Sequence, residues 1–318
     1  LAITTEGLTL EGPNAGLAGD SDQRGAEATI TDANGRLVIE APNVRIDGLD
    51  FQFDESAIQS KSGDNNLITN SRFELTGATS DTYAVRVGGD SPGTDVNNNL
   101  FTGIVSDDGI GGDNANGVVV TDPRDTRVAN NIFSSIDTAV NAGDKKSKAG
   151  TLVVEDNEFV DIKQFGAVLV NNDDGGLDLT VESNTIRSSD PGIFINKASS
   201  SASFTIEDNT FAGHASGQRL VDDRASVLNL AAAKTNNDFG STAKADDTKQ
   251  QILSVGVENV NQSTLFGSIE AAVDKAKVGD TLRLNSGTFD QSPKIDKQDI
   301  TLEGPNAGTP GDGDRGPE

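Results

Sequence analysis

The stretches VEDNEF (residues 154–159), VESNTI (181–186) and IEDNTF (206–211) decide the fold. Each begins with a β-branched residue, has Asn at its fourth position and ends with a bulky apolar residue. The same theme occurs, with variations, at residues 46–51, 68–73, 96–101, 128–133 and, in degenerate form, 234–239. Its last residue recurs every 22 to 32 positions. A period in this range, built from short strand patterns without helical spacing, is the signature of a solenoid.

A second strand pattern follows most copies of the theme, at residues 84–87, 117–120, 139–142, 167–170, 192–195 and 218–221. Each coil then holds two or three strands, which stack in parallel about 4.8 Å from those of the next coil. The bulky residues predict an internal aromatic stack, formed by Phe51, Phe73, Phe101, Phe133, Phe159, Phe211 and Phe239.

The Asn of the theme predicts a second column. Asn tolerates the left-handed backbone that a sharp coil corner needs, and stacked amides can hydrogen-bond along the solenoid axis. We therefore expect a structural ladder of Asn99, Asn131, Asn157, Asn184, Asn209 and Asn237.

Composition excludes several classes of protein. The 318 residues include 50 Asp and Glu against 25 Lys and Arg, one His, and no Cys, Met or Trp. Zinc fingers, iron–sulfur and copper sites, disulfides and a Cys nucleophile are excluded, which leaves hard cations held by oxygen. The apolar runs are too short to span a membrane. The net charge of −25 argues against nucleic acid and anionic lipid as partners and is similar to that of halophilic proteins.

The repeated coils resemble the right-handed parallel β-helix superfamily, the pectin-lyase-like fold, over nearly the whole chain. The resemblance implies an all-β solenoid. Residues 268–277 (SIEAAVDKAK) have helical spacing, with Ser268 as N-cap. This segment resembles the short capping α-helix and first coil that open many β-helix domains. We expect β-helix coils over residues 1–245, a linker over 246–264, and the capping helix and first coils of a further copy over 265–318.

A larger repeat frames the coils. ITTEGLTLEGPNAG at residues 3–16 returns 292 residues later as IDKQDITLEGPNAG at 295–308. This echo indicates duplication of a whole domain, so we expect the chain to begin inside one copy and end inside the next. Open β-helix ends expose strand edges that pair with other strands. The residues expected to form a head-to-tail assembly joint are Ile3, Leu8, Leu10, Ile269, Val273, Leu282 and Leu284.

Many pectin-lyase-like proteins cleave acidic polysaccharides, so an enzyme is the alternative. The stretch Asp107-Asp108-Gly109 is similar to one piece of the hydrolytic site pattern, but the single His214 is not flanked as that pattern requires. His214 is expected in a surface loop. Sugar grooves use exposed flat aromatics, and Tyr83 is the one candidate of that type. No residue is assigned a catalytic role.

Several acidic side chains have two possible roles, as calcium ligands or as a solvated acidic surface. Glu155, Glu182 and Glu207 share one theme position in consecutive coils and point outward. The loops carrying Asp20 and Asp22, and Asp312 and Asp314, partly match calcium loops. The alternatives are a calcium site and a solvated acidic face. Asn261 belongs to the only N-glycosylation sequon.

The sequence thus predicts a secreted protein at the cell surface or in the extracellular space. It would be the rod-like unit of a filament, stalk or giant adhesin, with itself as head-to-tail partner and surface glycans as a further partner class. The alternative is a polysaccharide lyase or hydrolase acting on acidic glycans.

Overall fold

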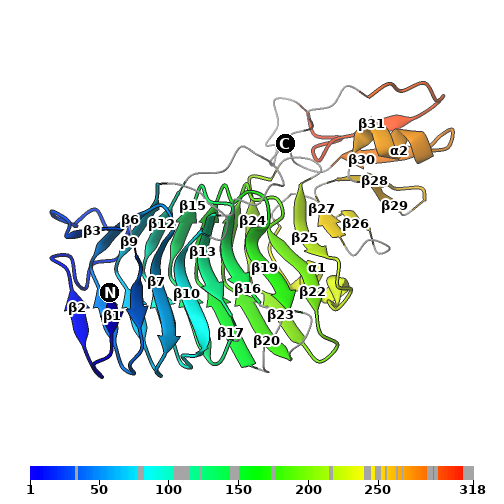
Figure 1. Ribbon diagram of the computed structural model, residues 1–318. Helices are drawn as coiled ribbons and strands as arrows, with labels where there is room; N and C mark the ends of the chain where they lie inside the picture. Colours follow the sequence, from blue (N-terminus) through cyan, green and yellow to red (C-terminus); the bar gives the residue numbers. More distant parts are fainter. Residues whose placement is uncertain are drawn as a thin grey trace.

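The computed structural model describes residues 1–32, 35–76, 82–103, 115–121, 123–143, 150–172, 176–214, 218–239, 245–247, 252–254, 256–262, 264–266, 268–284, 289 and 293–310. Within these residues, most strands pair in parallel with the corresponding strand of the next coil, and three long sheets run side by side along one axis (Figure 1). The predicted all-β parallel solenoid is confirmed.

Each sheet takes one strand from successive coils. The first sheet has the order β1 (Ala2–Ile3), β4 (Leu37–Ile39), β7 (Ser56–Ser62), β10 (Thr82–Asp90), β13 (Ala115–Val120), β16 (Thr138–Ala142), β19 (Gly166–Asn172), β22 (Ile193–Ala198), β25 (Arg219–Asp223), β27 (Ile252–Ser254) and β26 (Ala245–Asp247). The second consists of β2 (Thr9–Glu11), β5 (Arg45–Asp47), β8 (Leu67–Thr69), β11 (Asp95–Asn97), β14 (Thr126–Ala129), β17 (Gly150–Glu155), β20 (Leu177–Glu182) and β23 (Ser203–Glu207). The third consists of β3 (Thr29–Asp32), β6 (Asp50–Phe53), β9 (Arg72–Leu75), β12 (Leu100–Thr102), β15 (Ile132–Ser134), β18 (Glu158–Val160), β21 (Thr185–Arg187) and β24 (Thr210–Ala212).

The core is a set of columns parallel to the axis, because equivalent residues of successive coils are in register. In the third sheet Phe101 pairs with Phe73 on one side and Phe133 on the other. Their rings stack, with centroids 4.8 Å and 4.5 Å apart. The column begins with Ile30, which pairs with Phe51, and Ile186 interrupts the stacked rings. Burial of each Phe side chain in this column contributes about 1.5–3 kcal/mol to the stability of the solenoid.

The sharp corner between the second and third sheets is made by residues with positive φ. They precede the predicted ladder position by one residue: Gly48, Asn70, Asn98, Asn130, Asp156, Ser183 and Asp208. The expectation that the ladder Asn residues themselves adopt the left-handed conformation is therefore wrong. Gly, Asn, Asp and Ser are all short enough to tolerate that backbone, so the corner position varies in sequence.

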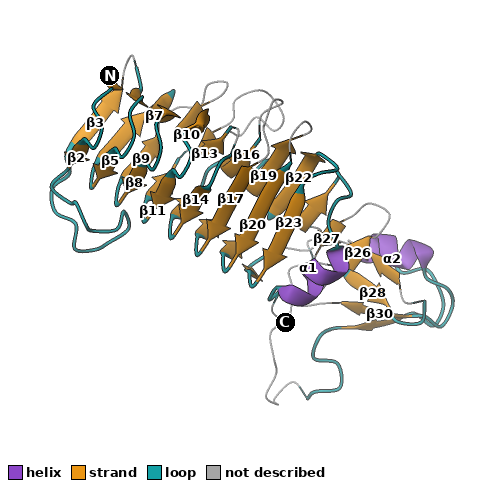
Figure 2. Ribbon diagram, turned by 90° about the horizontal axis from the view of Figure 1, so that it is seen from below, coloured by secondary structure: helices purple, strands orange, loops and turns teal. Residues whose placement is uncertain are grey.

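The last coil is closed by elements of another kind. Helix α1 (Leu230–Asn236), with the Asn229 side chain accepting a hydrogen bond from the Ala232 N–H, packs against β23 at the end of the second sheet (Figure 2). In the first sheet, β27 pairs antiparallel with β25 and with β26. The theme expected at residues 234–239 is correspondingly helical over its first three residues.

A small second unit, which we call the cap unit, follows. Its sheet has the order β29 (Thr264–Phe266), β28 (Val257–Asn259), β30 (Thr281–Leu284) and β31 (Thr301–Glu303). Helix α2 (Ile269–Lys275) packs on it, and the side chain of Ser268 accepts a hydrogen bond from the Ala271 N–H, as predicted for the N-cap.

The predicted linker needs correction. Residues 246–264 contain the strands β27 and β28, and buried Val257 belongs to the core of the cap unit. The second unit therefore begins at about residue 256 and not at 265. Among the described residues, neither helix has the length and apolar character needed to cross a membrane.

Candidate functional site

The Asn ladder is a continuous chain of buried hydrogen bonds. The Oδ1 of Asn157 accepts from both the backbone N–H and the side-chain Nδ2 of Asn131, each at 3.0 Å. The Nδ2 of Asn157 in turn donates to the carbonyl of Val128 at 2.9 Å. The same pattern links all six predicted residues: Asn99, Asn131, Asn157, Asn184, Asn209 and Asn237. Because these amides are buried and bonded to one another, they have no geometry for binding a ligand.

The acidic column lies on the outer face of the second sheet. Glu155 pairs in register with Glu182, and Glu182 with Glu207. Burial raises the pKa of Glu182, and the neighbouring side chain and charge of Glu155 raise it further. Arg127 approaches Glu155 from the preceding coil and also lies 3.5 Å from Asp95. Among the described residues, an Arg relieves the charge repulsion at the Glu155 end of the column.

The structure assembles no metal centre from these groups. In the part of the chain that it describes, no cluster of three or more His, Cys, Asp or Glu side chains is arranged to hold a metal ion. Asp20 and Asp22 lie in a loop whose backbone packs on the solenoid, with the Gly19 N–H donating to the Asn98 carbonyl at 2.8 Å. Asp312 and Asp314 lie outside the described residues. The calcium site remains a prediction.

His214 and Tyr83, the candidates for a hydrolytic site and for a sugar groove, are both buried. His214 is only 4% exposed, so its expected place in a surface loop is wrong. Its Nε2 lies 3.2 Å from the Ile186 carbonyl, and burial lowers its pKa. Tyr83 is also buried, and its hydroxyl accepts a hydrogen bond from Arg36 at 2.9 Å, so it offers no sugar platform. Residues 107–109 lie outside the described residues.

Asn261 is exposed at a turn of the cap unit. Its Oδ1 accepts a hydrogen bond from the Thr281 N–H at 2.8 Å. The side chain therefore has a structural role within the cap unit, and glycosylation there remains a prediction.

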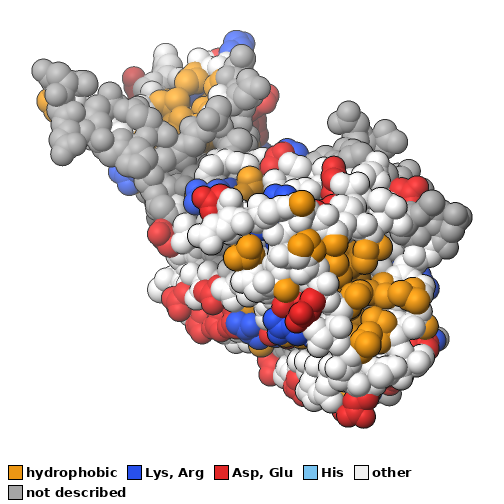
Figure 3. Space-filling model, turned by 90° about the vertical axis from the view of Figure 1, so that its left-hand side faces the viewer, with side chains coloured by type: hydrophobic (Ala, Val, Ile, Leu, Met, Phe, Trp, Pro, Cys, Tyr) orange, Lys and Arg blue, Asp and Glu red, His pale blue; other side chains and the backbone are white. Residues whose placement is uncertain are grey.

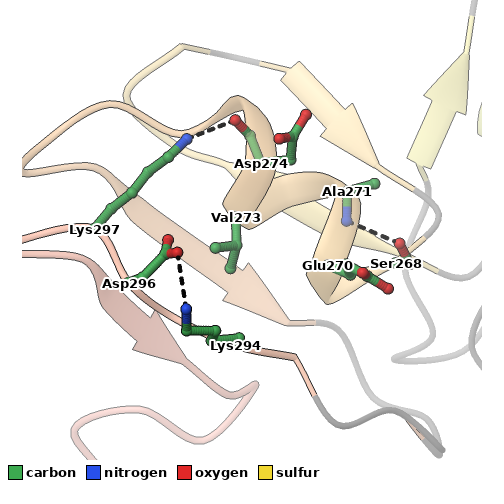
Figure 4. A pocket seen from close by; sticks show the side chains of 8 residues that line it. All are labelled: Ser268, Glu270, Ala271, Val273, Asp274, Lys294, Asp296 and Lys297. Atoms are coloured by element: carbon green, nitrogen blue, oxygen red, sulfur yellow. Dashed lines mark hydrogen bonds and ion pairs between the residues drawn. The ribbon is translucent and has the colours of Figure 1, made fainter.

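A hollow of about 450 Å³ lies in the cap unit between α2 and the segment 294–297 (Figure 4). Lys297 points across it, and its ammonium donates to the Asp274 and Ala276 carbonyls at the end of α2. Lys294 is 3.5 Å from Asp296. Lys297 thus holds the segment to the helix, and Lys294 belongs to an exposed ion pair. The hollow does not place a base beside a nucleophile.

The residues predicted to form the assembly joint fall into two groups at opposite ends of the molecule (Figure 1). One group, Ile3, Leu8 and Leu10, belongs to the first coil, which consists of β1, β2 and β3. There Leu8 and Ile30 are each 37% exposed, and apolar side chains gather on this face (Figure 3). The other group lies in the cap unit and packs around its core: Ile269, Val273, Leu282 and Leu284.

Comparison with known proteins identifies the scaffold. The family model described as periplasmic copper-binding protein (NosD) matches residues 91–265, more than half of the chain and all of the coils from β11 to β25. No curated protein matches the chain. The family match supports a β-helix protein of the periplasm or cell surface.

The donor set of this chain does not fit copper. Cu(I) is selected by soft Cys and Met ligands, and imidazole is the further ligand that suits copper. The sequence has no Cys or Met, and its one His is buried, with Nε2 beside a backbone carbonyl. The match therefore concerns the coils themselves. Because that match covers more than half of the chain, the chain belongs to the NosD family, whose members are right-handed parallel β-helices.

Proposed function

We propose that this protein is a rod-like structural unit of an extracellular or cell-surface filament, stalk or giant adhesin, repeated head to tail. The observation that carries the proposal is the return of the first-coil sequence TLEGPNAG 292 residues later, where it forms the last strand of the cap unit and the turn after it. Repetition on this scale makes a series of solenoids along one axis. Solenoid stability adds from neighbour to neighbour, so length is gained without a larger core.

The side chains support an architectural role. The interior is filled by the Phe column and the Asn ladder, and the outer face of the second sheet carries charge in place of exposed aromatics. Strong net negative charge keeps such a rod hydrated and discourages lateral association. Family membership supports a location outside the cytoplasm.

Calcium is part of the proposal as a stabiliser of the acidic column. Carboxylates in register on neighbouring strands repel one another, and a divalent cation or concentrated salt would relieve that repulsion. The raised pKa of Glu182 supports the presence of this repulsion. Surface glycans are proposed as a secondary partner class.

Electron microscopy of native material in high salt, with and without a chelator, tests the proposal. Filaments with an axial repeat of roughly 50 Å plus the joint, from about ten coils at 4.8 Å each, are expected. Their loss on chelation would support calcium as stabiliser. Monodisperse short particles would contradict the filament.

A second assay tests the polysaccharide lyase or hydrolase alternative. Purified protein is incubated with acidic polysaccharides while the absorbance of unsaturated products and the release of reducing ends are followed. We expect no turnover above that of a heat-unfolded sample. Reproducible turnover would replace the structural role with the enzymatic one.

A further inference from the structure

The echoed sequence occurs at residues 3–16 in the first coil and at residues 295–308 in the cap unit, and its backbone conformation agrees at two pairs of equivalent positions. Gly7 and Asp299, which are equivalent in the echo, have φ of 67° and 58°. Gly16 and Gly308 have φ of 80° and 85°. The turn after the strand repeats as well, because the N–H of Ala15 donates to Gly12 at 3.2 Å, and Ala307 and Gly304 make the same bond at 3.1 Å. The echoed segment is therefore one structural element present twice.

The two copies use opposite edges of that element. In the first copy, β2 pairs with the following strand β5, in the register Leu10 to Ile46. In the second copy, β31 pairs with the preceding strand β30, in the register Leu282 to Leu302. Each copy lies at the edge of its sheet in the described structure. A single strand that paired with β30 along one edge and with β5 along the other would join the cap unit to the coils without a break.

The core residues are complementary across such a joint. Leu282 and Ile46 are fully buried, whereas Leu10 is half-buried and its equivalent Leu302 is 40% exposed. Placing one leucine between Leu282 and Ile46 would bury both of its sides. The resulting column would continue the inward positions of the second sheet, which run from Ile46 through Ile68 to Val96.

The helix and the charges fit in the same register. Ile300 packs against the α2 core, while its equivalent Leu8 lacks that cover and is 37% exposed. Arg283 lies 3.4 Å from Glu303. In the joint it would lie beside Glu11, the equivalent of Glu303.

The other end of the coils excludes direct stacking of one solenoid on the next. Helix α1 covers β23, and the antiparallel strand β27 occupies the edge of β25. A following coil would need both positions as parallel strands. The cap unit is therefore the element through which two solenoids can be connected.

We propose that the apolar face of the first coil is the seat of a cap unit from a second copy of this repeat. In this joint β2 takes the place that β31 has in the cap unit, and it pairs in parallel with β30 in the register Thr281 to Thr9, Leu282 to Leu10 and Arg283 to Glu11. The inference rests on the proposed head-to-tail function and specifies its contact. The repeating unit then begins with a cap unit and continues into the coils. Residues 256–310 would be the start of such a unit, and coils of the NosD type would be its remainder.

A permuted chain tests this arrangement within one molecule. Residues 256–303 are followed directly by residues 12–255, which preserves the sequence TLEGPNAG at the junction. We expect the fluorescence of the apolar dye anilinonaphthalene sulfonate to fall severalfold relative to the chain in its original order. We also expect the Tm to rise by about 2–4 °C or more. Unchanged dye binding with an unchanged or lower Tm would overturn the joint.

Matched substitutions separate the joint from the effect of permutation itself. Leu302→Asp should lower the Tm far more in the permuted chain, where Leu302 lies between Leu282 and Ile46, than in the original order. Thr301→Asp, one residue earlier on the outward face, should have a small effect in both. Equal effects of Leu302→Asp in the two orders would contradict the proposed register.

A two-copy chain provides the second measurement, should the permuted chain not fold. Residues 1–303 are joined to residues 12–318 of another copy, and small-angle X-ray scattering measures the shape. A single rigid rod whose junction resists protease is expected. Two lobes on a cleavable hinge would overturn the joint, whereas absence of filaments in native material would remove the proposed function and leave the joint untouched.

Discussion

The Oδ1 of Asn184 lies 2.9 Å from the backbone nitrogen of Asn157 and 3.0 Å from its Nδ2, although the two residues are 27 positions apart. One side chain thus fixes the backbone and the side chain of the coil before it. Five such links in succession, from Asn99 to Asn237, hold neighbouring coils in one register at the corner of the solenoid.

Replacement of a ladder residue should be costly. Asn157→Ala removes the acceptor for two buried donors of Asn131. Each buried donor left without a partner costs about 1–3 kcal/mol, so we expect a loss of about 2–5 kcal/mol in the free energy of unfolding, measured with urea. Asn171→Ala is the control, because Asn171 lies half-buried on the outer face and should cost less than about 1 kcal/mol. Equal losses would show that the ladder has no special role.

The aromatic column should respond to a single cavity. Phe133 stacks between Phe101 at 4.5 Å and Phe159 at 5.2 Å. Phe133→Ala should cost about 3–5 kcal/mol, because the rigid coils above and below cannot close the space. Phe133→Leu should recover part of that loss in the same thermal or urea unfolding measurement. If Phe204→Ala, at a half-buried position, destabilised the protein as much, the importance of the stack would be refuted.

The acidic column predicts a pH dependence of one sign. The pKa of Glu182 is raised by burial and by the neighbouring Glu155 and Glu207 carboxylates, so the folded protein binds its proton more tightly than the unfolded chain does. Its charge therefore destabilises the fold at neutral pH, and stability is regained as the pH falls through the folded pKa. Glu182→Gln should raise the Tm at pH 7 and have no effect at acidic pH. A lower Tm at pH 7 would contradict the repulsion.

Asp47 should show the opposite sign. Burial would raise its pKa, but hydrogen bonds from the Asn70 side chain, the Gly16 N–H and Arg45 overcome this and lower it. Stability from Asp47 is fully present above the unfolded pKa and is lost as the pH falls through the folded pKa. Asp47→Asn should therefore lower the Tm at pH 7 and become neutral in acid. A Tm profile parallel to that of Glu182→Gln would be inconsistent with this assignment.

Copper binding provides a direct test of how this chain differs from the description of its family. The absence of Cys and Met and the burial of His214 predict no stoichiometric Cu(I) binding. Protein incubated anaerobically with Cu(I) and a chromogenic competitor should retain far less than one equivalent after desalting. Retention of one equivalent, abolished by His214→Gln in a folded variant, would refute the prediction.

The register of the coils could be predicted because the same residue types recur at the same position of the repeated theme. The position of Phe133 in the theme is that of Phe101 and Phe159, and stacking in a solenoid requires equivalent residues to lie above one another. For the same reason, the shared position of Glu155 and Glu182 in the theme is sufficient to predict that they lie side by side. Position in the theme was sufficient wherever the contact joins neighbouring coils.

Other features depend on information that the theme does not contain. The left-handed corner residue is Asn130 in one coil and Asp156 in the next, so its residue type varies, whereas the neighbouring ladder position is a constant Asn and draws the prediction to itself. The helix α1 interrupts the theme where Ala-rich sequence follows Asn229, a helix signal that coil alignment overlooked. Burial of His214 and Tyr83 results from packing between distant segments, which local polarity does not reveal.

Closure of the last coil by α1 and the antiparallel β27 also determines how such an assembly can be sized. Bare parallel coils would add to one another without limit, as in cross-β fibres, and their length would follow protein concentration. Here the solenoid terminates itself, and under the proposed joint a further one would require a new cap. If the proposed rod forms, its extent would be encoded as the number of repeats in the gene, and recombination between copies would shorten or lengthen it without altering a single contact.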